Sequence, residues 1–279
     1  MLAKPVTELS TFIVLSCSDL AVVVAVSSTY TSGLANVARP RGDSTLAELT
    51  MAASKTPLNF VPGSRWQYSN TGINTLGRIV EVVSGMAFSN FLKDRLLIPC
   101  GMKDTTFWPD IIQSSRVAKS YRPNKEGVLE ETKVFIVDGK LSDRKRTPFA
   151  SGGLYSTATD VTAFYQMMLN GGVSQGKRLL KKKTVKQMTQ TQTGNIETGF
   201  VDGMSWGLGF QVVKKSKGAT GMLSSGTYGH GGAYATQSWA DPKTGLIYVL
   251  MIQRAGFPNG DNSLVRKGFQ QAAVDEFVR

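Results

Sequence analysis

The sequence has few of the residues that build metal sites and disulfide frameworks. It holds one histidine and two cysteines, Cys17 and Cys100, among 279 residues, and no Cys-x-x-Cys pair. A zinc site with histidine and cysteine ligands is therefore nearly excluded by count, and a disulfide framework is not indicated. We predict no metal and no other cofactor. Cys100, in an apolar stretch, is expected to be a small buried side chain.

Long hydrophobic runs are also lacking, and no apolar stretch is long enough to span a bilayer. Residues 12–17 are similar to the end of a lipoprotein signal, but Glu8 and Asp19 flank an apolar core that is too short for one. Without a clear export signal the compartment stays open, and a periplasmic or secreted full-length parent is one alternative.

Acidic residues are outnumbered, since 32 Lys and Arg against 20 Asp and Glu give a net charge of +12. The basic residues lie in small groups, such as 181–183 and 214–215, and aromatic residues do not interleave with them. We therefore predict a solvated charged surface and no nucleic-acid partner. A basic module that binds anionic surfaces is kept as an alternative function.

Apolar residues at helical spacing predict a helix over 73–84, which Asn70 or Thr71 would cap, and a second over 88–98, which Pro99 would end. Further helices are expected behind Thr157, whose pairing with Asp160 resembles a capping box, in the second half of 177–190, and over 265–277. Helices thus dominate the middle of the chain.

Strands are expected mainly near the end of the chain. They are predicted at residues 21–26, 134–137, 207–213, 235–240 and 246–254. The last two would be joined by a hairpin turn over 241–245. This order of elements indicates an α+β protein with a helical lobe beside a sheet.

The most informative stretch is 62–72, in which a Pro-Gly turn and an aromatic pair precede Tyr68, Ser69 and Asn70. A tyrosine hydroxyl held before a helix can transfer protons if its surroundings lower its pKa. The alternative is that Tyr68 is a half-buried aromatic residue and that Asn70 only caps the helix.

A second informative stretch, 227–234, lies between predicted strands and holds His230, the one histidine. Gly229, Gly231 and Gly232 would let the backbone approach a ligand closely and direct N–H groups at it, as in an oxyanion site. The alternative is a glycine-rich hairpin with a hydrogen-bonded imidazole.

Both stretches, with the Gly-Gly-Leu-Tyr-Ser-Thr segment 152–157 between them, resemble the serine β-lactamase-like family of class C β-lactamases, D-alanyl-D-alanine peptidases and esterases. The resemblance runs from about Leu58 to the C-terminus and includes 99–105 and the Trp-x-Asp-Pro hairpin at 239–242. It implies a β-lactamase/transpeptidase-like fold, with an antiparallel sheet flanked by helices. The expected parts are a poorly matching segment 1–40 and a domain over 41–279, with the helical lobe at about 60–200 and the sheet and closing helix at about 205–279.

The resemblance also implies a mechanism, in which a serine attacks an acyl carbonyl and water hydrolyses the acyl-enzyme. Tyr68 matches the family tyrosine that relays the proton together with a lysine. Asn70 matches the residue that hydrogen-bonds that lysine or the substrate amide. His230 lies where many members have the lysine of a Lys-Thr-Gly strand. The implied substrate contacts are Ser69, Gly231, Gly232 and Ala233, the last through an oxyanion N–H. A small acyl compound or a peptidoglycan-like ligand is the implied partner.

The chain departs from the family pattern at the nucleophile. The family's Ser-x-x-Lys lies upstream of the tyrosine, whereas here only Ser142 and Ser174 begin such a spacing, and neither opens an apolar helix. Residues 31–34 resemble a His-Thr-Ser-Gly-Leu turn that follows the nucleophile, with Tyr30 in the place of the histidine. We therefore expect a chain that starts downstream of the nucleophile, with catalysis in doubt and with an exposed sheet edge that favours homo-oligomers.

Two main hypotheses follow. The first is a serine hydrolase with an unrecognised nucleophile, for which Ser28, Ser32 and Ser69 are the candidates. The second is a non-catalytic member of the same fold that binds a lactam, an ester or a D-alanyl peptide. Both require that Tyr68 and His230 face the same cleft.

Overall fold

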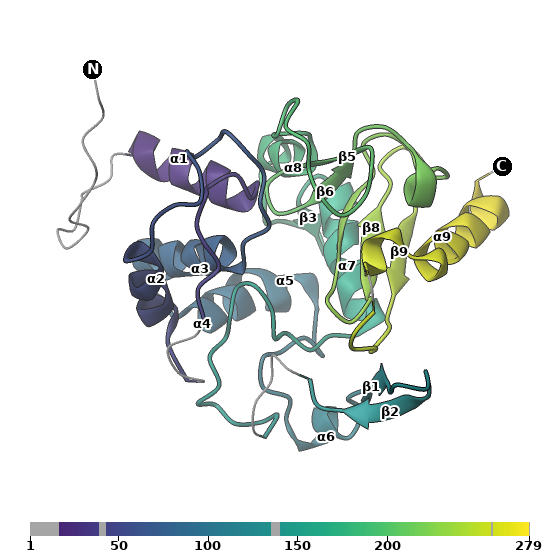
Figure 1. Ribbon diagram of the computed structural model, residues 1–279, viewed down its shortest axis with the longest axis horizontal. Helices are drawn as coiled ribbons and strands as arrows, with labels where there is room; N and C mark the ends of the chain where they lie inside the picture. Colours follow the sequence, from purple (N-terminus) through teal and green to yellow (C-terminus); the bar gives the residue numbers. More distant parts are fainter. Residues whose placement is uncertain (1–16, 39–42, 135–139, 258, 279) are drawn as a thin grey trace.

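The computed structural model describes residues 17–38, 43–134, 140–257 and 259–278, and Figure 1 shows a helical part beside a sheet with its own helices. Helix α3 (Asn70–Ser84) is the centre of the helical part and packs against α1 (Cys17–Ser28), α2 (Leu46–Ser54) and α4 (Phe88–Leu92). Helix α3 ends where Gly85 takes the left-handed conformation (φ 67°), as the sequence predicts.

The N-terminal cap of α3 is Ser69, one residue before the predicted caps Asn70 and Thr71. Its hydroxyl accepts a hydrogen bond from the Gly72 N–H (3.1 Å) and donates one to the Leu34 carbonyl (2.9 Å). Serine is among the best N-cap residues because its oxygen satisfies an N–H group that the first turn leaves unpaired. Asn70 therefore becomes the first residue of the helix, and its exposed side chain is available for other contacts.

The prediction of a strand at 21–26 was wrong, because these residues lie within helix α1. A short apolar run fits a strand or a packed helix equally well, so periodicity alone could not decide. The run is also less buried than a core strand would be, with Val22 61% exposed.

The prediction that Pro99 ends the second helix was wrong. Helix α4 continues through the π-helical turn η1 (Lys93–Leu97) into α5 (Ile98–Cys100), which ends at the left-handed Gly101. The Ile98 N–H bonds to the Lys93 carbonyl and the Met102 N–H to the Leu97 carbonyl, both five residues back. Pro99 has no N–H group and cannot donate a hydrogen bond within the helix. The wider π-helical turn before it accommodates this residue without ending the helix.

Five antiparallel strands form the main sheet, in the order in which they occur along the chain. They are β5 (Met204–Trp206), β6 (Gln211–Val213), β7 (Tyr228–Gly231), β8 (Gln237–Ala240) and β9 (Ile247–Leu250). The strands are shorter than predicted, because Gly209 and Ala235 have positive φ values and belong to turns. His230 lies on strand β7 itself, so its prediction between strands was wrong.

The hairpin between β8 and β9 is confirmed. Its Asp241 carboxylate accepts hydrogen bonds from the N–H groups of Lys243 (2.9 Å) and Thr244 (3.3 Å), and Gly245 is left-handed. No strand of the described chain pairs with the outer edge of β5 or β9. Association of chains through such an edge stays a prediction.

The two faces of the sheet bury different helices because successive strand residues point to opposite sides. Val212 packs in the cluster that includes residues of α7 (Ala158–Leu169) and α8 (Lys182–Thr189). Val213 packs instead in the cluster that residues of α9 (Leu264–Phe277) adjoin. The α+β prediction, with an antiparallel sheet flanked by helices and a helical lobe, is therefore confirmed.

Two small hairpins and three short helical turns complete the described fold. They are β1 (Ser120–Pro123) with β2 (Leu129–Thr132), β3 (Val173–Ser174) with β4 (Lys177–Arg178), α6 (Ile111–Ser114), η2 (Gly218–Thr220) and η3 (Gly260–Asn262). The strand predicted at 134–137 falls largely outside the described residues. None of the described helices is both long and apolar enough to cross a bilayer.

Candidate active site

Tyr68 and His230 lie on the same cavity, although 162 positions separate them in the chain. The loop before α3 carries Tyr68 and strand β7 carries His230, and their ring centroids are 6.1 Å apart. Pairing of His230 with Ser238 on β8 fixes the strand that holds the imidazole. The central requirement of the sequence-based hypotheses is therefore met.

The cavity has a volume of about 1120 Å³ and brings together most of the predicted site. The predicted residues that line it are Tyr68, Asn70, His230, Gly231, Gly232 and Ala233. Ser69 does not line it, because its buried hydroxyl is committed to the cap of α3 and to Leu34. Its placement among the substrate contacts is not supported, and any effect of Ser69 on a ligand would pass through its neighbours.

The imidazole of His230 has a defined hydrogen-bond direction. Its Nδ1 contacts the carbonyl oxygen of Gly231. Since a carbonyl only accepts, Nδ1 carries the proton, and in the neutral ring Nε2 is left as the acceptor. The half-buried ring also meets Trp206 edge-on, with centroids 5.3 Å apart, so the side chain is held from two sides.

The two glycines after His230 have close neighbours that leave little space for a side chain. A Cβ atom at Gly231 would lie 1.8 Å from Asp261 Oδ1, and one at Gly232 would lie 2.1 Å from Thr236 Oγ1. The Gly232 N–H already donates to the Thr236 carbonyl (2.8 Å), whereas no described residue accepts from the N–H of exposed Ala233. Of these two groups, the Ala233 N–H is therefore the one available to a ligand oxygen.

An aromatic cluster surrounds Tyr68 and joins the helical part to the sheet. Its members are Tyr30, Trp66, Tyr68, Phe200, Trp206 and His230, which are linked by ring contacts at centroid distances between 4.5 and 6.2 Å. Trp206 is fully buried. Burial raises the pKa of Tyr68, so its hydroxyl holds its proton at neutral pH. Phe200 and Trp206 were not predicted as neighbours of the site, and their aromatic character was the one available signal.

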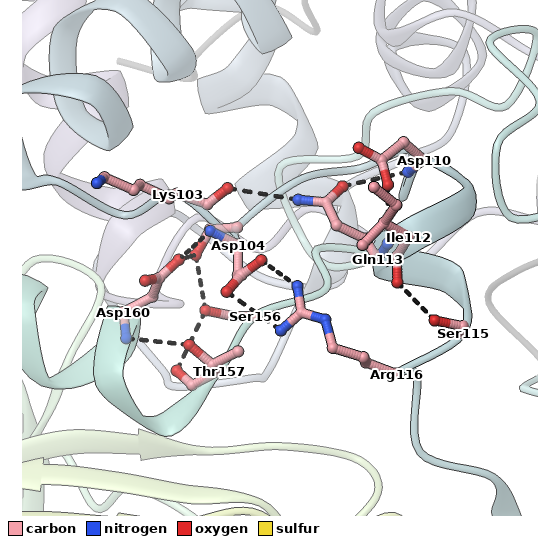
Figure 2. A network of polar contacts seen from close by, with 11 residues as sticks. Lys103, Asp104, Asp110, Ile112, Gln113, Ser115, Arg116, Ser156, Thr157 and Asp160 are labelled. Atoms are coloured by element: carbon pink, nitrogen blue, oxygen red, sulfur yellow. Dashed lines mark hydrogen bonds and ion pairs between the residues drawn. The ribbon is translucent and has the colours of Figure 1, made fainter.

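A polar network that includes the cavity-lining residues Asp104, Ser156 and Thr157 is centred on Asp160, at the start of α7 (Figure 2). Thr157 caps α7 as predicted, but the Asp160 carboxylate does not reach back to complete a capping box. It accepts instead from the Asp104 N–H (2.8 Å) and the Thr105 hydroxyl (2.7 Å). Because the Thr105 proton goes to the carboxylate, Ser156 is the donor in its 2.8 Å contact with Thr105.

An ion pair extends this network toward α6. Arg116 binds both carboxylate oxygens of Asp104, and the Gln113 amide donates to the Lys103 carbonyl, as Figure 2 shows. The Arg116 guanidinium lowers the pKa of the Asp104 carboxyl, so the pair stays charged over the neutral range. Asp104, Gln113 and Arg116 all line the cavity.

The serines proposed from the sequence as nucleophiles lie elsewhere. Ser28, Ser32 and Ser69 are at most 5% exposed, and none lines the cavity. Ser142 and Ser174, which open the two Ser-x-x-Lys spacings, do not line it either. The serines that do are Ser151, Ser156 and Ser238. Among the described residues, no group of three His, Cys, Asp or Glu side chains could hold a metal ion.

Comparisons with known proteins show to which sequences and structures the chain is similar. A sequence model of the Beta-lactamase family matches residues 28–272. Protein Rv1367c of Mycobacterium tuberculosis is 32% identical over 216 residues, which are 72% of this chain and 52% of that protein. Penicillin-binding protein 4 of Amycolatopsis lactamdurans is 30% identical over 229 residues, which are 80% of this chain and 57% of the relative.

The solved structure of EstCE1, described as a hydrolase with promiscuous acyltransferase activity, has the same fold. It aligns with a TM-score of 0.68 at 19% identity, over 88% of this chain and 69% of EstCE1. The chain spans about half the length of the curated relatives it matches. Since the family model covers most of the chain, the protein belongs to the β-lactamase family and has its serine-hydrolase-related fold.

Proposed function

We propose that the cavity binds an acyl compound (a lactam, an ester or a D-alanyl peptide) with its carbonyl group between Tyr68 and His230. The observation that carries this proposal is the 6.1 Å approach of the two rings on a single cavity. A phenol that holds its proton donates to a carbonyl or leaving-group oxygen, and a neutral imidazole with a free Nε2 accepts a proton. The site thus offers an acid and a base to one ligand group.

The remaining contacts would orient the ligand. The Ala233 N–H would donate to the carbonyl oxygen, where negative charge develops during acyl transfer. Asn70, exposed at the first position of α3, would hydrogen-bond an amide of the ligand. Gly231 and Gly232 line the same cavity, so their backbone is within reach of the ligand. The name of Penicillin-binding protein 4, a relative of this chain, agrees with a lactam ligand.

Binding is tested by thermal unfolding with penicillin G, a p-nitrophenyl butyrate analogue that cannot be cleaved, and N-acetyl-D-alanyl-D-alanine. A ligand at 100 times its Kd stabilises the folded state by about 2.7 kcal/mol, which raises Tm by roughly 5–10 °C for a chain of this size. Tyr68→Phe and His230→Gln should reduce the shift, whereas Tyr121→Phe on the exposed hairpin should not. The absence of a shift with all three ligands would refute the proposal.

Catalysis is a separate question, which covalent labelling answers. In acylation a serine hydroxyl would lose its proton to His230 as its oxygen bonds to the carbonyl carbon, and His230 would pass that proton to the leaving group as its bond to this carbon breaks. Water, losing a proton to His230, would then attack the acyl-enzyme, and the serine oxygen would leave with that proton. The labels are a fluorophosphonate and penicillin G, followed by peptide mass spectrometry. An adduct on Ser151, Ser156 or Ser238 would identify the nucleophile. A thermal shift without any adduct would show a non-catalytic binding protein.

A further inference from the structure

The segment 259–261 contacts two parts of the proposed site without lining the cavity itself. The Asn259 amide donates to the Phe200 carbonyl (2.9 Å), and the ring of Phe200 belongs to the aromatic cluster described above. At the next residue, Gly260, a Cβ atom would lie 3.1 Å from the Cα of Ala235, which is in the turn between β7 and β8. The segment therefore packs against both the aromatic cluster and this turn.

The Asp261 carboxylate lies at the root of the same turn. The turn opens after Gly231 and closes at Gln237, which are paired as the last residues of the β7–β8 ladder. Asp261 Oδ1 accepts from the Gln237 amide (2.9 Å), and a Cβ atom at Gly231 would lie 1.8 Å from the same oxygen. Oδ2 accepts from the Gln211 amide on β6 (3.1 Å). One carboxylate thus contacts three adjacent strands.

A closed ring of contacts fixes the direction of the hydrogen bond from Gln237. The Trp239 indole N–H donates to Gln237 Oε1 (2.8 Å), so the NH₂ group of that amide is directed at Asp261. The Arg266 guanidinium lies over the Trp239 ring, 4.0 Å from its centroid, and donates to the backbone carbonyl of Asp261 (2.7 Å). Trp239 and Arg266 are fully buried, so this ring holds Asp261 against the sheet.

The turn above Asp261 carries the Ala233 N–H, which the proposed function directs at a ligand oxygen. Within the turn, the Gly232 N–H donates to the Thr236 carbonyl (2.8 Å) and the Ala235 N–H to the Gly232 carbonyl (2.9 Å). The φ of Ala235 is 69°, in the left-handed region that a residue with a Cβ atom rarely adopts. Such a conformation persists where its surroundings over-determine it, and the contacts from 260–261 are part of these surroundings.

We infer that Asp261 is a positioning residue of this site, whose carboxylate holds in place the β7–β8 turn that carries the Ala233 N–H. The inference rests on the proposed function, in which this N–H stabilises the charge that develops on the carbonyl oxygen of the ligand. Asp261 acts through Gly231 and Gln237, which line the cavity.

The test is amide hydrogen exchange of the full chain, followed by NMR at the N–H groups of Gly232 and Ala235. Asp261→Ala removes both acceptor oxygens, and we expect these two groups to exchange about tenfold faster, the equivalent of one lost hydrogen bond. Asp261→Asn is the matched variant, because it keeps an oxygen for Gln237. The Gln211 amide can turn over and present Oε1, which has no partner in the described chain, to the new NH₂ group. We expect its exchange within about threefold of wild type.

Asp241→Ala is the control for a loss of stability alone, because this buried carboxylate holds the hairpin at the other end of β8, away from the cavity lining. Unchanged exchange in Asp261→Ala would overturn the inference, as would an equal rise in Asp241→Ala or in Asp261→Asn. If Asp261→Ala does not fold, Gly260→Ala decides, since its Cβ atom pushes η3 away from Ala235 and must speed the exchange of that N–H. An unchanged rate there would overturn the inference.

The exchange rates need no ligand, so the failure of this inference and the failure of the proposed function are distinguishable. A chain that binds no acyl compound can still show that Asp261 holds the turn. Where a ligand stabilises the wild-type protein, Asp261→Ala should weaken its Kd about tenfold, whereas Asp261→Asn should not. Faster exchange with an unchanged Kd in Asp261→Ala would overturn the positioning role.

Discussion

Replacing Asp160 tests the polar network that holds the cavity-lining residues Asp104 and Ser156. The side chain is 6% exposed, and its Oδ2 accepts two hydrogen bonds, from the Asp104 N–H and the Thr105 hydroxyl. A hydrogen bond to a charged group contributes about 1.5–3 kcal/mol, and a donor left unsatisfied in a buried position carries a penalty of its own. Since neighbouring contributions are not fully additive, we expect Asp160→Ala to lower the free energy of unfolding by about 3 kcal/mol.

Asp160→Asn separates the charge from the shape of this side chain. Its amide oxygen can occupy the position of Oδ2 and keep both hydrogen bonds, so we expect a loss of only about 1 kcal/mol. Asp202→Ala is the control, because its carboxylate is exposed and its ion-pair partner within the described residues is Lys217. Surface pairs of this kind change stability by at most about 1 kcal/mol.

Urea unfolding provides the measurement. With a slope of about 3 kcal/mol per molar urea, the expected loss for Asp160→Ala moves the midpoint down by about 1 M while the slope stays the same. A midpoint within about 0.3 M of wild type would refute the reasoning. Equal losses in Asp160→Ala and Asp160→Asn would also refute it, since they would show that the retained oxygen contributes nothing.

Three other changes have definite expected outcomes. Gly229→Ala places a Cβ atom 2.2 Å from the Ser238 carbonyl oxygen, so overpacking should lower stability by about 2 kcal/mol and Tm by several degrees in a thermal scan. Gly268→Ala, in helix α9 with no atom within 4 Å of the new Cβ, should instead raise stability by up to about 1 kcal/mol, and a lower Tm would contradict this expectation. Burial raises the pKa of Tyr248 to about 12, so the folded state keeps a proton that the unfolded chain releases from about pH 10. The stabilisation is complete below pH 10 and is lost as the pH rises toward 12; denaturant titrations should show a shallower fall in Tyr248→Phe, and an identical fall would argue against this account.

Local patterns predicted several elements because their causes are local. The end of α3 at Gly85 and the turn at Asp241 each depend on neighbouring residues alone. The approach of Tyr68 to His230 was expected from the family resemblance, since no local pattern links residues so far apart.

Other features could not be predicted because distant contacts decide them. The apolar run 21–26 becomes a helix through its packing against α3. The hairpin of β1 and β2 has mostly exposed residues on both faces, so it has none of the alternation that marks a half-buried strand. Phe200 and Trp206 join the site through ring contacts with residues of the helical part, which the sequence does not place next to them.

The order of strands in the main sheet has a consequence for how the protein folds. Each strand pairs with its neighbour in the chain, so every pairing from β5 to β9 closes only a short loop. Short loops close at low entropic cost and favour rapid formation. The contact of Tyr68 with His230 must instead close a loop of more than 150 residues, and so we expect the sheet to be organised before the cavity acquires its second wall.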